Sequence, residues 1–318
     1  MVHSRYAPDR GLQARMGLTM FLLGLVFVAF IAILVAVLTA FKAASGSGII
    51  VIAVLVGAAV AFGSFFYSDK IALATAGAQL VEPTDGPDAA RIHGVVDRLC
   101  ALADMPKPRI AISPQPMPNA FATGRNADKA VLCVTTGIMR QLDDRELEGV
   151  IAHEMSHVAH RDVAVMTIAS FIGIIAALLV RFGFYSELFG GGRGGRGNNN
   201  NAPFVVVALA MMVIGAVTYA VSFLLIRLLS RYRELAADRS GALLTGQPSA
   251  LASALTKVSG AMAQIPTQDL RKAEPLNAFY FAPALKPDHT SLSTLFSTHP
   301  SLERRLQQLS DISAQLGR

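Results

Sequence analysis

Four long apolar runs are the feature that most limits how this chain can fold. The first, residues 18–41, lies in a stretch between Arg15 and Lys42 that carries no charged residue. It exceeds the ~20 residues that an α-helix needs to cross a bilayer, and it is too long for the apolar core of a signal peptide. The second follows a short turn at 42–48 and lasts until Ser68. Together the two runs predict a helical hairpin through the membrane.

The third and fourth runs, 163–180 and 204–226, are separated by a Gly/Arg/Asn-rich linker at 190–201 that has no capacity to build a core. The fourth is long enough to cross, whereas the third is shorter and contains Thr167 and Ser170. If their outer ends build one site, either both runs cross or neither does, and the alternative is a pair of buried or interfacial helices. The runs divide the chain into an N-terminal hairpin at 1–68, a polar part at 69–162, the paired runs at 163–229 and a C-terminal part at 230–318.

Composition supports a membrane protein. Only 16% of the residues are charged, against about 25% in a typical soluble domain. The net charge of +6 has no nucleic-acid-binding motif beside it, so we expect a lipid bilayer as partner and no nucleic acid. Arginines precede the first run and follow the fourth, which places both ends and the polar part in the cytoplasm. Cys100 and Cys133 lack metal-site spacing and are expected to be buried thiols, although one disulfide stays open.

The polar part ends in a helix that carries the chemistry. It reads LEGVIAHEMSHVAHRD, and Asp143 with Glu146 forms a capping-box pattern at its start. His153 and His157 are four residues apart, so they share a helical face and can grip one metal ion. Glu154 follows the first histidine and can take a proton from water at that metal. This spacing also occurs by chance in unrelated proteins, so it needs a third ligand beside it.

Six residues are candidates for that third ligand: His160, Asp162, Glu234, Asp238, His289 and His299. Glu234 and Asp238 are the best placed, because they lie four apart on a helix that we expect to begin after the fourth run. One carboxylate can ligate zinc while the other orients a ligand histidine. The competing interpretation is a solvated charged face shared with neighbouring arginines. His160 lies two turns from His153 and is expected to be a surface residue.

Ahead of this helix, the polar part predicts a small mixed domain. A helical pattern at 82–105 is followed by β-type runs at 109–112 and 130–135, with the segment PNAFATG at 118–124 between them.

The motifs resemble the HtpX-type membrane metalloproteases, relatives of the CAAX-prenyl endoproteases. HEMSHVAHRD and SRYRELAADRSGALLTG carry the resemblance, together with SDKIALATAGAQ, PNAFATG and STHPSLERRLQQL, so it covers nearly the whole chain in order. It implies a mainly α, integral membrane fold with a cytoplasmic zincin-like α+β domain and a small edge-strand sheet. The implied function is a zinc endopeptidase of the bacterial inner membrane that serves quality control and the stress response by cleaving misfolded or damaged membrane proteins and unfolded polypeptides.

The resemblance also assigns site residues. It implies that His153, His157 and Glu234 bind one zinc ion (Zn²⁺) per chain, that Glu154 is the general base and that Asp238 supports a ligand. For the substrate, the PNAFATG match implies that Asn119, Ala120 and Phe121 lie beside the substrate backbone as an edge strand.

The residues near the C-terminus supply two weaker candidates. His299 and Arg304 are candidate donors to the oxyanion, although a helix start after THPS, with Arg304 on its solvated face, explains them equally well. The sequence leaves a homo-oligomer open.

Three other functions compete with this one. A structural zinc site would need four protein ligands, usually including cysteine. A transporter would carry charges inside its apolar runs, and these runs have none. A prenyl-protein processing enzyme would use the same motif chemistry, so only substrates separate it from a quality-control protease.

Overall fold

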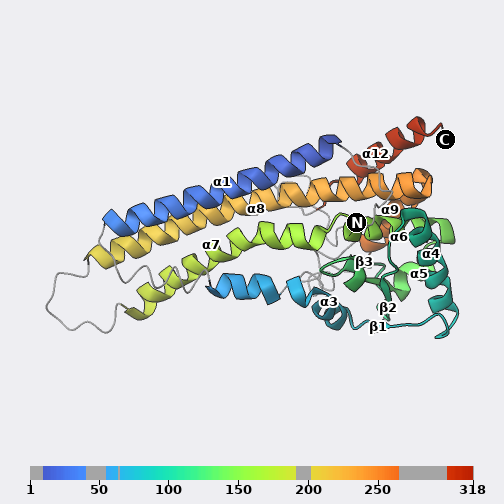
Figure 1. Cartoon of the computed structure of the whole chain (residues 1–318), viewed down its shortest axis with the longest axis horizontal. Coiled ribbons are helices and arrows are strands. Elements are labelled where there is room, and N and C mark those ends of the chain that lie inside the picture. The colour runs from blue at the N-terminus through green and yellow to red at the C-terminus, as the bar shows by residue number, and fades with distance from the viewer. Residues whose placement is uncertain (1–9, 41–54, 64, 191–201, 265–298, 318) are drawn as a thin grey trace. The chain divides into compact units, whose positions relative to one another are not determined.

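The computed structural model describes residues 10–40, 55–63, 65–190, 202–264 and 299–317 (Figure 1). The chain divides into two compact units, one made of residues 17–64 and 166–229 and the other of residues 1–16, 65–165 and 230–318. Most of the linker predicted at 190–201 and the first part of the second apolar run lie outside the described residues.

The apolar unit is built from long helices. They are α1 (Arg10–Ala40), a helical stretch at 55–63, α7 (Asp162–Gly190) and α8 (Ala202–Thr245). One end each of α1, α7 and α8 belongs to the other unit. Among the described residues, Arg10–Val37 and Leu209–Thr245 are long and apolar enough to cross a membrane. The first predicted run lies in α1 as far as Ala40, and the fourth lies within α8. The third run passes the same test only if α7 is joined to the helix before it, and the two are bent by 57°.

Small residues let α7 and α8 approach closely. A Cβ added to Gly215 of α8 would lie 2.9 Å from a methyl of Val180 and 3.2 Å from the carbonyl oxygen of Ala176. Such close backbone approach is typical of helix pairs that pack inside a bilayer.

The prediction that a new helix begins after the fourth run is wrong. α8 continues without a break from the apolar run through the segment that carries Glu234 and Asp238 (Figure 1). The physical reason is that the residues after Ile226 are mostly Arg, Leu, Glu and Ala, which favour helix, with no proline or glycine before Gly241. The arginines that begin at Arg227 mark a change of polarity along one helix.

The other unit contains a four-stranded sheet in the order β1-β2-β4-β3. The strands are β1 (Gln79–Leu80), β2 (Arg109–Ser113), β3 (Ala120–Thr123) and β4 (Val131–Thr135). β2 and β4 pair in parallel and confirm the two predicted strands, while β1 and β3 pair antiparallel at the edges. A short 3₁₀ turn at Ala127–Lys129 lies between β3 and β4.

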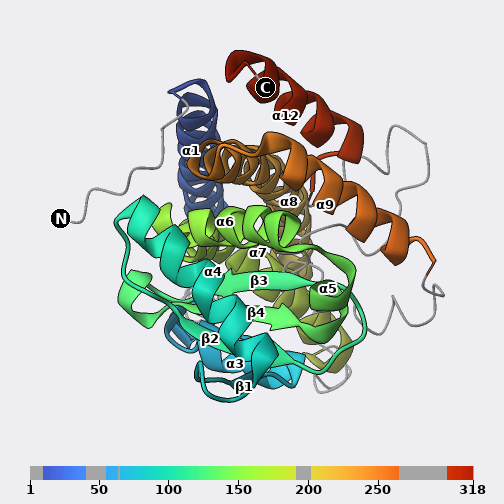
Figure 2. The ribbon, with the colours of Figure 1, turned by 90° about the vertical axis from the view of Figure 1, so that its right-hand side faces the viewer.

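Alternating side chains give the sheet two apolar faces. Ile110 and Leu132 face the main core, which includes residues of α4 (Pro87–Ala103), α6 (Asp144–Ala159), α9 (Pro248–Met262) and α12 (Leu302–Gln315). Val131 and Cys133 face a smaller cluster under α3 (Ser68–Ala76). The short α5 (Thr136–Gln141) follows β4 directly. Figure 2 shows α6 beside β3 at the edge of the sheet.

Both cysteines are buried and free, as predicted. Burial raises the pKa of the Cys100 thiol to about 11 and that of the Cys133 thiol to about 12.

Candidate active site

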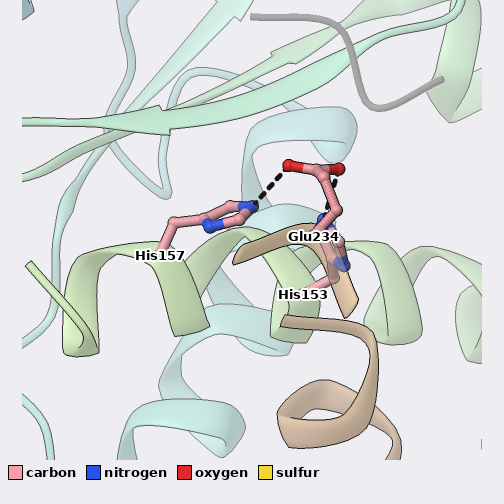
Figure 3. A group of neighbouring side chains, drawn as sticks. All are labelled: His153, His157 and Glu234. Atoms are coloured by element: carbon pink, nitrogen blue, oxygen red, sulfur yellow. Dashed lines mark ion pairs between the residues drawn. The ribbon is translucent and has the colours of Figure 1, made fainter. Parts of the chain in front are cut away.

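Helix α6 begins at a fixed point and delivers its two histidines to one face. The Asp143 carboxylate accepts the N–H groups of Arg145 and Glu146, and the Glu146 carboxylate accepts the Asp143 N–H, so the predicted capping box is present. Ten residues on, His153 and His157 lie on successive turns with ring centroids 4.9 Å apart and planes at 89°. Figure 3 shows both rings on α6 and directed toward Glu234, which comes from α8.

The three side chains form a set that fits a metal ion. His153 Nε2 lies 3.8 Å from Glu234 Oε2, and His157 Nε2 lies 3.5 Å from Glu234 Oε1. The donor atoms all lie within 4.8 Å of one another, and the three residues are buried. Two imidazoles and one carboxylate are a donor set typical of catalytic metal centres, in which a fourth position is left to a reactant.

His153 is backed by a buried carboxylate and a buried arginine. Its Nδ1 lies 2.9 Å from Asp238 Oδ1, which leaves Nε2 as the nitrogen that faces Glu234. Asp238 in turn accepts two hydrogen bonds from Arg305, at 2.7 Å from Nε and 2.6 Å from Nη2. Arg305 also reaches within 3.9 Å of Glu234.

Arg305 is a site residue that sequence reasoning missed. It is 1% exposed and comes from α12, on the same helical face as Leu309 and Ile312. An arginine on the apolar stripe of an amphipathic helix was the available signal, because such a charge needs a buried partner.

His157 also contacts a carboxylate through Nδ1. The distance from Nδ1 to Asp162 Oδ2 is 2.5 Å. An ionised carboxylate only accepts hydrogen bonds, so Nδ1 of His157 carries the proton and Nε2 presents its lone pair toward Glu234. Asp162, one of the six candidates for the third ligand, therefore contacts His157 on the side away from Glu234.

Glu154 lies beside this cluster without joining it. Its Oε1 is 4.0 Å from His153 Nε2, and its Oε2 accepts a hydrogen bond of 3.1 Å from the backbone N–H of Ala122. Burial raises the pKa of the Glu154 carboxyl, and the neighbouring histidines oppose that shift only in part. A carboxyl with a raised pKa can both take and return a proton near neutral pH.

The strand β3 brings the predicted substrate segment to the edge of the site. The Thr135 N–H donates to the Asn119 carbonyl, so by the alternation of an antiparallel ladder the backbone of Phe121 also faces β4. The backbone groups of Ala120 and Ala122 therefore point away from β4, and the bond from Ala122 to Glu154 agrees with this. Of the three predicted residues, Ala120 presents its backbone outward.

The remaining candidates do not belong to the set of three possible ligands, although His299 contacts one of its members. His299 is buried, and its Nδ1 donates to Glu234 Oε2 at 3.0 Å. Arg304 is exposed in the first turn of α12, where its backbone N–H donates to the Ser301 N-cap. His160 is partly buried at the end of α6, and His289 lies outside the described residues.

Glycines allow the helices around the site to touch. A Cβ added to Gly241 of α8 would lie 2.9 Å from the backbone nitrogen of His153, and one added to Gly149 of α6 would lie 3.3 Å from the backbone of Leu251. The approach at Gly241 holds Glu234 and Asp238 of α8 within reach of the histidines on α6, and the approach at Gly149 packs α6 against α9.

Comparisons with known proteins identify the family of this chain. The model of peptidase family M48 matches residues 87–313. The protease HtpX homolog 1 of Streptomyces coelicolor is 56% identical over 99% of this chain and 97% of its own. The protease HtpX homolog of Moorella thermoacetica is 49% identical over 97% of this chain and 96% of its own.

A solved structure shares the fold. The crystal structure of Ste24p from S. mikatae superposes with a TM-score of 0.53 at 15% identity, covering 93% of this chain and 67% of that one. The candidate membrane helices, the cluster of residues that could hold a metal ion and the matched family all fit a membrane metalloprotease. The chain therefore belongs to peptidase family M48 and, within it, to the HtpX-type membrane metalloproteases.

Proposed function

We propose that this metalloprotease is a zinc endopeptidase that cleaves misfolded or damaged membrane proteins from the cytoplasmic side of a bacterial inner membrane. The observation that carries the proposal is the buried set of His153, His157 and Glu234, with the Glu154 carboxylate 4.0 Å from a ligand nitrogen. Three protein ligands of this kind are typical of catalytic zinc, whereas structural zinc sites have four.

Glu154 would carry the proton transfers. Zinc held by the three ligands would supply Lewis acidity toward the scissile carbonyl and toward water. Because Ala122 occupies Oε2 of Glu154, the oxygen that faces His153 is the one that takes the proton from the attacking water. The same carboxyl then passes the proton to the leaving amine, a role that suits its raised pKa.

The substrate would add a strand to the open edge of β3. The outward N–H and C=O of Ala120 and the outward C=O of Ala122 are the backbone groups that would hold it, within the segment that begins at Asn119 and includes Phe121. Backbone pairing is independent of side chains, which suits an enzyme that acts on many unfolded polypeptides. It also needs an extended substrate, so folded proteins would be spared.

His299 is the better of the two proposed oxyanion donors. It is buried and reaches Glu234 through Nδ1, so its ring is held at the metal ligand. Arg304 is exposed at the start of α12.

The continuity of α8 supports a substrate that leaves the bilayer. Glu234 follows the end of the apolar run at Ile226 by eight residues of the same helix, which is about 12 Å along the axis. The arginines between them, Arg227, Arg231 and Arg233, are the signature of a cytoplasmic flank.

The test compares the wild type with Glu154→Gln, purified in detergent without metal and then supplied with zinc. We expect both to bind zinc, and only the wild type to cleave casein and an unfolded membrane protein, with chelator abolishing cleavage. Zinc bound by the wild type without cleavage of either substrate would contradict the endopeptidase. A second variant, Glu234→Ala, should lose the metal, and full zinc occupancy in it would contradict the third ligand.

A further inference from the structure

The break between α6 and α7 has an uncommon backbone conformation at its centre. α6 ends at Ala159, α7 begins at Asp162, and Arg161 between them has a φ of 56°. A residue with a Cβ adopts this left-handed conformation at a cost, so surrounding contacts must hold it. In the part of the chain that the structure describes, Asp104 is the one other non-glycine residue with positive φ, and it ends α4 as an ordinary cap.

The break is what allows Asp162 to reach a ligand. In an uninterrupted helix, a residue five positions after His157 would lie about 140° away around the axis. The left-handed residue bends the chain instead, with 57° between α6 and α7, and Asp162 Oδ2 lies 2.5 Å from His157 Nδ1. The Asp162 side chain is 2% exposed.

A residue of α8 holds Asp162 in turn. Arg233 Nε lies 3.0 Å from Asp162 Oδ2, and the arginine side chain is 14% exposed. Arg233 immediately precedes Glu234, so one turn of α8 supplies both the third ligand and the group that holds the carboxylate behind His157. This arrangement repeats on the other histidine, where Arg305 holds Asp238.

We infer that Asp162, turned back by the left-handed Arg161 and held by Arg233, is a positioning residue that fixes the tautomer and direction of His157 at the metal. The inference rests on the proposed zinc site. A carboxylate on Nδ1 keeps the proton there and directs Nε2 to the ion, and losing such a group typically weakens metal binding about 10- to 100-fold.

The experiment measures zinc affinity of the full chain in detergent by competition with a chromophoric chelator. Asp162→Ala should bind zinc about 10- to 100-fold more weakly than the wild type. The matched control is Glu148→Ala, which removes a buried carboxylate of α6 that pairs with Arg98. The control should bind as the wild type does, and an Asp162→Ala variant with wild-type affinity would overturn the inference.

Two further sets of variants test the holding group and the backbone. Arg233→Met should weaken zinc binding. The double variant Arg233→Met/Asp162→Ala should lose little more zinc affinity than the more affected single variant. Fully additive losses of affinity would show that Arg233 does not act through Asp162. Arg161→Gly accepts positive φ and should bind zinc as the wild type does, while Arg161→Val should bind more weakly. Equal, undiminished affinity in these two would exclude the role of the backbone turn.

Two checks distinguish a folding defect from a loss of positioning, and a failure of the proposed function from a failure of this inference. If Asp162→Ala aggregates, the isosteric Asp162→Asn takes its place and should still lose about tenfold in affinity. If the wild type itself binds no zinc, the proposed function fails, whereas wild-type binding with unchanged affinity in both Asp162 variants refutes only the positioning role.

Discussion

Replacing Gly241 with alanine tests whether the close approach of α8 to α6 sets the metal site. The new Cβ would lie 2.9 Å from the His153 nitrogen, 3.1 Å from its Cα and 3.2 Å from the Ala152 carbonyl carbon. All three neighbours are backbone atoms of a packed helix, so they cannot rotate away. Ordinary contact begins at 3.4 Å, so the helices must separate by several tenths of an ångström. Glu234 lies two turns along α8 from the added methyl group and would move with it.

The energies give the size of the effect. Overpacking costs about 1–3 kcal/mol, and the helix regains about 1 kcal/mol when glycine becomes alanine. The metal-free protein therefore loses about 0–2 kcal/mol of stability. Metal ligands tolerate displacements of only about 0.2 Å, so the bound state resists the separation that would relieve the strain. If the zinc-bound protein retains 2 kcal/mol of this strain, zinc affinity falls about 30-fold.

The assay is zinc competition together with thermal unfolding of the metal-free protein. Gly260→Ala is the matched control, because it adds the same methyl group to an exposed position of α9 with nothing within 4 Å. The control should keep wild-type zinc affinity and gain about 0.5–1 kcal/mol of stability. Wild-type zinc affinity in Gly241→Ala would refute the reasoning that helix separation controls the ligand geometry.

Three other predictions concern buried polar groups. Although burial opposes ionisation of Glu146, hydrogen bonds from Lys257, Ser253 and the Asp143 backbone hold its pKa below the ordinary value. The ionised carboxylate therefore stabilises the fold above about pH 4.5, and this stabilisation is lost as pH falls through the lower folded pKa. Glu146→Gln should cost about 2 kcal/mol of stability at pH 7 and flatten the acid limb of a pH–stability curve. Arg305→Met should cost about 3–5 kcal/mol of stability in urea unfolding, because it strands a buried carboxylate, and a neutral result would contradict the buried pairing. Iodoacetamide at pH 8 should leave Cys133 and Cys100 unmodified until the chain is unfolded, which mass spectrometry of tryptic peptides would show.

Local spacing predicted the part of the site that one helix carries. His153, Glu154 and His157 follow from the period of α6, and the capping box at Asp143 fixes where that helix begins. The spacing of Glu234 and Asp238 made them the best placed candidates for the third ligand, but the same spacing also fits a solvated charged face, and the family resemblance assigned the ligand role to Glu234. The change from apolar to charged residues after Ile226 resembles a helix boundary, but it marks only a change of polarity along the continuous α8.

The groups behind the ligands were harder to predict, because each depends on a contact distant in sequence or on a backbone conformation. Arg305 meets Asp238 across 67 residues. Asp162 reaches His157 only because Arg161 leaves the helical region of backbone space. The order of the sheet, with β4 between β2 and β3, likewise comes from tertiary packing.

The pairing of acids and bases around the ligands has a consequence for charge balance. Within the described part of the chain, four buried carboxylates gather here, from Glu154, Asp162, Glu234 and Asp238, and two guanidinium groups face them, from Arg233 and Arg305. With neutral histidines and every carboxylate ionised, the pocket holds two uncompensated negative charges, the amount that one divalent cation neutralises. Unpaired charge in a dry interior is costly, so the empty pocket must take up protons or admit water. A bound divalent ion would thus serve as the counter-ion that lets these acids share one site.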